Sequence, residues 1–72
     1  MHATLDLRGV RCPLSWARAK VKLEMLERGT ELTLMLDDPR GVRDIPRAAE
    51  AEGYAVGEAI RADDHWRLTI TV

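Results

Sequence analysis

Apolar and polar residues alternate in several stretches of the chain, which is the pattern of strands with one buried face. The clearest stretch is residues 31–36, where leucine occupies every second position. Residues 3–7 and 66–72 show the same period of two. A further strand is expected over residues 54–61, where Gly57 interrupts the alternation and predicts a bulge.

The stretch between the first two strands has helical periodicity instead. A helix is predicted over residues 13–28, because Pro13 suits the first helical position and Gly29 suits the residue after the end. The apolar residues expected to enter the core are Trp16, Ala19, Leu23 and Leu26. A second apolar stripe lies almost opposite, formed by Leu14, Ala17, Val21 and Met25. That stripe is either a set of scattered surface residues or a surface for a protein partner, and both interpretations stay open.

A second helix is predicted after the strand over residues 31–36. Asp38 followed by Pro39 is typical of a helix cap and a first helical residue. Pro46 argues against one long helix, because proline lacks an N–H and crowds the preceding turn. The sequence therefore predicts a short turn over residues 40–42 and then a helix over Asp44–Glu52, capped by its first residue.

The order of these elements is βαβαββ, with a hairpin loop over residues 62–65 before the last strand. A strand, a helix and a strand joined by short connections imply a right-handed unit with a parallel strand pair. Strands covered on both faces would show continuous apolar runs rather than alternation. The pattern therefore favours an α+β fold of two layers over a doubly wound sheet.

Composition narrows the class of protein. The 72 residues, taken as one domain over 1–72, are 46% hydrophobic and 32% charged, as in a globular chain. The net charge of −1, with acidic and basic residues interspersed, is unlike that of a protein that binds nucleic acid directly. No stretch resembles a signal peptide or a membrane span, and the single cysteine cannot form an internal disulfide. A cytoplasmic location is the expectation.

Cys12 is the candidate for chemistry. It directly precedes Pro13, so it is expected to cap the first helix. The unpaired N–H groups and the dipole of a helix N-terminus favour a thiolate over a thiol, and so do the flanking Arg8 and Arg11. The alternative is a small buried hydrophobic residue, which is a common role for a free cysteine.

The other residues that often carry chemistry give little support to a second centre. His2 and His65 are the only histidines, each far in sequence from Cys12, and both are predicted to lie on the surface. Their spacing does not match a metal site, so neither a metal nor a cofactor is expected.

Three segments together resemble the TusA/SirA-like sulfur-carrier family. They are Leu5-Asp6-Leu7-Arg8-Gly9-Val10-Arg11-Cys12-Pro13, Asp37-Asp38-Pro39 and Arg43-Asp44-Ile45-Pro46. The resemblance implies a two-layer sandwich with two helices on one face of a four-stranded mixed sheet. It also implies that Cys12 carries sulfane sulfur as a persulfide, supported by Arg11, Pro13, Ser15 and Arg43.

The resemblance further implies protein partners. The sulfur donor would be a cysteine desulfurase, a rhodanese or a DsrE-like protein. The acceptor would belong to tRNA thiolation, molybdenum-cofactor assembly or sulfur oxidation. Arg43 is expected either to turn toward the Cys12 loop or to pair with an acidic neighbour.

One position departs from the family motif, which is Cys-Pro-x-Pro. Ser15 stands here in place of the second proline. Serine restores an N–H, which is expected to point at the sulfur of Cys12. The departure also keeps a second hypothesis open, a regulatory or adaptor domain that binds a partner without transferring sulfur. A third hypothesis, an RNA-binding module of related topology, is disfavoured by the near-neutral charge and the few aromatic residues.

Overall fold

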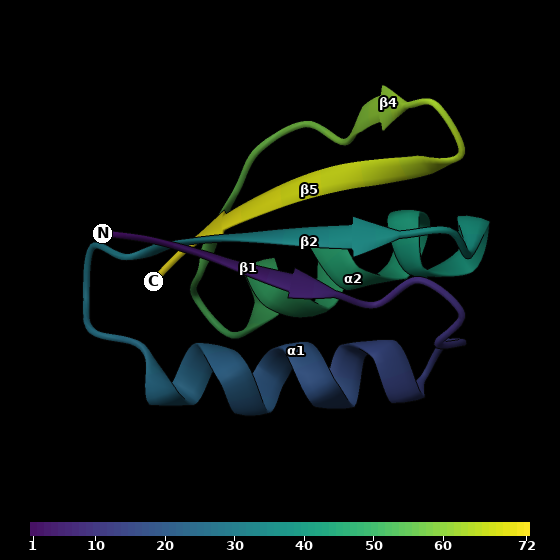
Figure 1. Cartoon of the computed structure of the whole chain (residues 1–72). Helices are drawn as coiled ribbons and strands as arrows, with labels where there is room; N and C mark the ends of the chain where they lie inside the picture. Colours follow the sequence, from purple (N-terminus) through teal and green to yellow (C-terminus); the bar gives the residue numbers. More distant parts are fainter.

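The computed structural model describes residues 1–72 and shows two helices lying against one face of a sheet (Figure 1). The elements follow in the order β1 (His2–Asp6), α1 (Leu14–Met25), β2 (Glu31–Leu36), α2 (Pro39–Ala51), β3 (Ala55–Val56), β4 (Ile60–Ala62) and β5 (His65–Thr71). The bounds of β2 are those that the sequence predicts. The predicted α+β fold of two layers is confirmed.

The sheet is mixed, as predicted. β1 and β2 run parallel, while β5 pairs antiparallel with β2 on one side and with β3 and β4 on the other. The strand order β1-β2-β5-β3 leaves β1 at one edge. Because α1 connects the two parallel strands, its N-terminus lies near their carboxyl ends (Figure 1).

The predicted third strand divides in two, so the sheet has five strands instead of four. Val56 lies opposite Ile70, but Ile60 lies opposite Arg67, so four steps along one strand match three along the other. One residue is therefore extra, as in a β-bulge. The Gly57 N–H still donates to a β5 carbonyl at 2.9 Å, so the interruption follows the glycine, as the sequence indicates.

The core lies between the sheet and the helices. Every second residue of β2 faces the helices and is at most 1% exposed. The buried apolar residues are Leu7, Ala19, Leu23, Leu32, Leu34, Leu36, Ile45, Ala49, Leu68 and Ile70. Trp16 and Leu26, from the core face predicted for the first helix, are half-buried against this cluster.

The predicted bounds of the first helix are too wide at both ends. Pro13, not Cys12, is the residue before the first helical one, and no side chain caps it. At the other end the backbone of Leu26 is extended, which keeps its side chain against the core. Gly29 lies three residues further on in a turn of positive φ, where its N–H donates to the Val72 carbonyl. Contacts with the C-terminal residue therefore place this turn, and the helix stops before it.

The prediction of a short second helix is also wrong. α2 begins at Pro39, with Asp38 as its cap, and continues through Pro46 without a break. Proline removes one N–H from the helix, but Ile45 and Ala49 of the same helix are fully buried. Burial of this apolar face stabilises the longer helix against the loss of one hydrogen bond. Asp44 consequently lies inside the helix and caps nothing.

Candidate functional site

Cys12 lies in the loop between β1 and α1, at the rim of an open hollow of about 510 Å³. The other wall of the hollow is the junction between β2 and α2, more than twenty residues further along the chain. The lining residues are Gly9, Arg11, Cys12, Asp37, Asp38, Pro39 and Arg40. Cys12 is the free cysteine of the chain and is partly exposed, so the residue is neither part of the core nor fully open to solvent.

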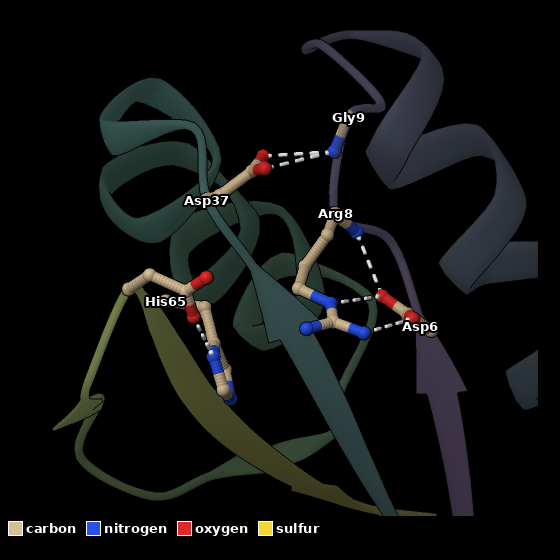
Figure 2. Close-up of polar contacts among 6 residues, drawn as sticks. Asp6, Arg8, Gly9, Asp37 and His65 are labelled. Carbon is tan, nitrogen blue, oxygen red and sulfur yellow. Dashed lines mark hydrogen bonds and ion pairs between the residues drawn. The ribbon is translucent and has the colours of Figure 1, made fainter.

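Two consecutive aspartates join the walls of the hollow. The Asp37 carboxylate accepts the Gly9 N–H at 2.9 and 3.0 Å, one bond to each oxygen (Figure 2). Asp38 accepts the Cys12 N–H at 3.1 Å on one oxygen and the Arg40 N–H at 3.0 Å on the other. Asp38 thus caps α2 and holds the backbone of the cysteine with the same carboxylate.

The two backbone donors also stabilise the charged form of this carboxylate. The hydrogen bond from the Arg40 N–H, followed by that from the Cys12 N–H, holds the pKa of Asp38 below its usual range. Asp38 therefore remains an anion and an acceptor at neutral pH, not an acid. The predicted role as a cap is correct, but the sequence analysis did not connect Asp38 with Cys12.

Arg8 and Asp6 stiffen the start of the cysteine loop. The Arg8 guanidinium turns back onto the Asp6 carboxylate with two hydrogen bonds, of 3.0 and 2.9 Å (Figure 2). The side chain of Arg8, and then its backbone N–H, lowers the pKa of Asp6 to about 2. Arg8 is therefore paired at the base of the loop and does not line the hollow, whereas Arg11 does.

Arg43 was expected either to turn toward the Cys12 loop or to pair with an acidic neighbour, and it does the second. Arg43 is largely exposed and pairs with Asp44 at 3.0 Å. This hydrogen bond is the main cause of its raised pKa, and Cys12 makes a smaller electrostatic contribution. Arg40, which the sequence analysis did not select, lines the hollow directly. A signal was present, because Arg40 follows Asp38-Pro39 at the carboxyl end of a predicted strand.

Ser15 does not lie where the sequence analysis expects it. Its N–H donates to the Arg11 carbonyl at 3.1 Å and so is not available to the sulfur of Cys12. The side chain is fully buried, and its hydroxyl has no hydrogen-bond partner. A methyl group built on Gly41 would lie 3.6 Å from that oxygen, so Ser15 faces α2 across the contact between the helices. Ser15 thus belongs to the packing between the two helices and not to the surroundings of the sulfur.

We expect Ser15→Ala to raise the free energy of unfolding by about 1 kcal/mol, because it removes a buried hydroxyl that bonds to nothing. Gly41→Ala should act in the same direction, since alanine favours a helix and its methyl group finds ordinary contact distances. Urea unfolding of both variants measures the effect. A loss of stability in Ser15→Ala would show that the hydroxyl binds a buried water.

The outer stripe of α1 is exposed, as its periodicity predicts. Leu14, Val21 and Met25 are 53%, 59% and 74% exposed, and Ala17 is exposed beside them. Leu14 is two residues from Cys12, so the stripe begins at the hollow. Its role in binding a partner stays a prediction.

One of the two histidines contradicts its predicted surface position. His65 is 7% exposed, and its Nδ1 lies 2.9 Å from an Asp64 oxygen. It does not line the hollow, and Figure 2 shows its side chain well below the contact between Gly9 and Asp37. His2 is exposed, as predicted, and its Nε2 lies 2.7 Å from the Thr33 hydroxyl. Neither imidazole lines the hollow that contains Cys12.

The structure holds no group of three or more His, Cys, Asp or Glu side chains placed to bind a metal ion. Neither helix combines the length and the apolar composition needed to cross a membrane.

These features define a class of small α+β proteins that present one loop cysteine at the carboxyl ends of a parallel strand pair. The chain belongs to the family described as sulfurtransferase TusA, whose model matches residues 3–72. A solved SirA-like protein from Desulfitobacterium hafniense has the same fold, with a TM-score of 0.85 and 29% identity over 97% of this chain and 96% of that one.

Named relatives agree with this assignment. A protein of Archaeoglobus fulgidus named "Putative sulfur carrier protein" is 42% identical over 76% of this chain, and the match spans 62% of the archaeal protein. A relative from Methanocaldococcus jannaschii with the same description is 35% identical over 92% of this chain and 88% of its own length. The sulfur carrier protein TusA of Buchnera aphidicola is 40% identical over 60% of this chain and 54% of its own.

Proposed function

We propose that this protein is a sulfur carrier that holds sulfane sulfur as a persulfide on Sγ of Cys12. The observation that carries the proposal is the placement of Cys12 at an open hollow, with its backbone held by Asp38. Membership of the TusA family and the names of the relatives support the same role. A carrier needs a reachable nucleophile on a firm support, and this loop provides both.

The chemistry is an exchange between sulfur atoms. The Cys12 thiolate attacks the terminal sulfur of a donor persulfide, a new S–S bond forms on Sγ, and the donor cysteine leaves as a thiolate. Delivery is the same kind of step, with Cys12 now as the leaving group. An acceptor nucleophile attacks the outer sulfur of the Cys12 persulfide, and Cys12 leaves as a thiolate. No electron is gained or lost overall, so the cycle needs no redox cofactor.

The residues around the hollow suit an anionic sulfur. Arg11 and Arg40 line it and bring two positive charges to the hollow in which a persulfide anion would lie. Asp37 and Asp38 are also present, but their carboxylate oxygens bond to backbone N–H groups of the loop and of α2. The aspartates thus bond to the backbone, whereas Arg11 and Arg40 line the same hollow as Cys12 without a salt bridge inside the chain.

The test is intact-mass spectrometry after incubation with inorganic polysulfide and, separately, with a cysteine desulfurase and cysteine. The expected result is a gain of one sulfur atom, reversed by a reductant and absent in Cys12→Ser. A thiol that alkylates freely but gains no sulfur from any donor would overturn the carrier function. That result would favour the hypothesis of an adaptor domain. Ser15, on which that hypothesis was based, lies buried between the helices.

We also propose that the exposed stripe Leu14, Ala17, Val21 and Met25 contacts the protein partners, which are a sulfur donor and a sulfur acceptor. Val21→Glu and Met25→Glu should weaken binding to a cysteine desulfurase, because each places a charge in an apolar contact. Their free energies of unfolding should change by less than about 0.5 kcal/mol, since both side chains face solvent. Pull-down and thermal unfolding measure the two effects, and a large drop in stability would contradict the assignment of this face.

A further inference from the structure

β1 is an edge strand whose outer side carries unpaired backbone groups. The Leu7 N–H donates to the Met35 carbonyl, and the Met1 carbonyl accepts the Glu31 N–H, so the odd-numbered residues of this strand bond to β2. In a parallel pair the residues between them point their N–H and C=O groups the other way. The backbone groups of His2, Thr4 and Asp6 therefore face outward, with no strand beside them.

This edge lacks several of the devices that usually protect one. Native edge strands often carry lysine, proline or a bulge, which prevents another strand from adding to them. None of these is present in His2–Asp6, and its register with β2 is uninterrupted. The edge is thus able to accept a further strand.

An apolar groove lies next to the edge. Leu5 of β1 forms one side of it, and α1, which runs alongside β1 in Figure 1, forms the other. The lining residues are Leu5, Ala17, Arg18, Val21, Lys22 and Met25, around a volume of about 430 Å³. A strand added to β1 would lay the side chains of one of its faces into this groove, because side chains of a strand alternate between faces.

The charge of the groove indicates what kind of segment binds in it. Arg18 and Lys22 are its charged residues, neither forms a salt bridge within the chain, and no acidic residue lines it. A second copy of this chain, related by a two-fold axis along the edge, would bring the same cations toward each other. Like charges opposed in this way disfavour the homodimer.

We infer that the groove between β1 and α1 binds an extended, acidic and apolar peptide segment of a partner protein as an additional strand on β1. The backbone of Thr4 exchanges hydrogen bonds with the segment, apolar side chains of the segment contact Leu5 and Val21, and acidic ones pair with Arg18 and Lys22. Strand addition of this kind supplies affinity through the backbone and specificity through the pockets for side chains.

This inference deepens the proposed function, on which it rests for the partner being a sulfur donor or acceptor. The groove shares Ala17, Val21 and Met25 with the outer stripe of α1, which begins beside Cys12. A segment held on β1 would therefore anchor the partner within reach of the sulfur without occupying the hollow.

The inference is tested by selecting peptides that bind the whole chain from a phage-displayed library of random linear peptides. Selected peptides are expected to be acidic and apolar, and to slow the hydrogen exchange of the Thr4 and Asp6 amides in NMR. Thr4→Pro removes one outward N–H and no bond to β2, so it should keep the fold and abolish binding. The double variant Arg18→Glu/Lys22→Glu should weaken binding about tenfold or more, whereas Arg47→Glu on α2 should not.

Failure to select peptides, selection of basic ones, or selection of peptides that leave the exchange of both amides unchanged would overturn the inference. The double charge reversal decides the question if Thr4→Pro unfolds. Loading of Cys12 with inorganic polysulfide is measured on the same variants and should be normal in all of them. A chain that binds the peptides but takes up no sulfur would contradict the proposed function and leave the docking mode standing.

Discussion

Asp38→Ala is expected to lower the rate of the proposed sulfur delivery by Cys12 between about 10- and 100-fold, since a small displacement of a reacting group has effects of this size. The substitution removes the acceptor of the Cys12 N–H, so the loop loses its bond to the wall formed by β2 and α2. It also removes the acceptor of the Arg40 N–H and thereby the cap of α2. The thermal midpoint should fall by several degrees.

Single-turnover transfer from persulfidated protein to a small thiol acceptor measures the rate, and calorimetry measures the midpoint. Asp44→Ala is the matched control, because it removes a carboxylate of the same helix that bonds only to the exposed Arg43. It should change neither quantity appreciably. Equal transfer rates in the two variants would mean that the Asp38 bond does not position the cysteine.

The same bonds predict a dependence on pH. Two N–H donors hold the pKa of Asp38 below its usual range, so the folded state binds the proton less tightly than the unfolded chain does. The stability that Asp38 contributes is therefore fully present above the unfolded value of about 4 and is lost as the pH falls through the lower folded value. The difference in thermal midpoint between the protein and Asp38→Ala should be constant near neutrality and shrink in acid.

Leu34→Ala is expected to cost about 2–5 kcal/mol of the free energy of unfolding, the range for truncating a buried leucine. Leu34 is 0% exposed and lies in β2, which pairs with β1 on one side and β5 on the other. Small proteins have about 0.05–0.15 kcal/mol of stability per residue, or about 4–11 kcal/mol for the 72 residues here. The side chain of Leu34 thus accounts for a large share of the total free energy of unfolding.

Urea unfolding at 25 °C measures this cost, and Val21→Ala serves as its control. Val21 lies in α1 and is 59% exposed, outside the buried core, so its truncation creates no cavity. We expect little change in the control and a cooperative transition in both variants. A cost below about 1 kcal/mol for Leu34→Ala would mean that the two layers collapse around the missing atoms.

Much of the fold follows from local periodicity. The alternation in residues 31–36 predicts the bounds of β2 correctly, and the two stripes of the first helix separate the buried Ala19 and Leu23 from the exposed side, although they miss the buried Ser15. Both predictions succeed because a strand or helix repeats its environment every few residues, so the pattern is complete within the element. The parallel pairing of β1 and β2 is also confirmed, since short connections leave one handedness for the helix between them.

Helix ends were less predictable, because they depend on residues far away. α1 ends early so that Leu26 can pack on the core and Gly29 can bond to Val72, at the other end of the chain. α2 continues through Pro46 because the burial of Ile45 and Ala49 outweighs the missing N–H. Neither cause is visible within the helix itself.

The sequence by itself determined the order of the strands and helices, apart from the division of the third strand, and that the single cysteine lies between a strand and a helix. Only the tertiary structure decided what surrounds that cysteine. The parallel register of β1 and β2 brings Asp38 to the Cys12 N–H across 26 positions of the chain, and the contact between α1 and α2 buries Ser15 against Gly41. Periodicity is a local property and can be read from neighbouring residues, whereas hydrogen bonds and packing between distant segments exist only once the layers have come together.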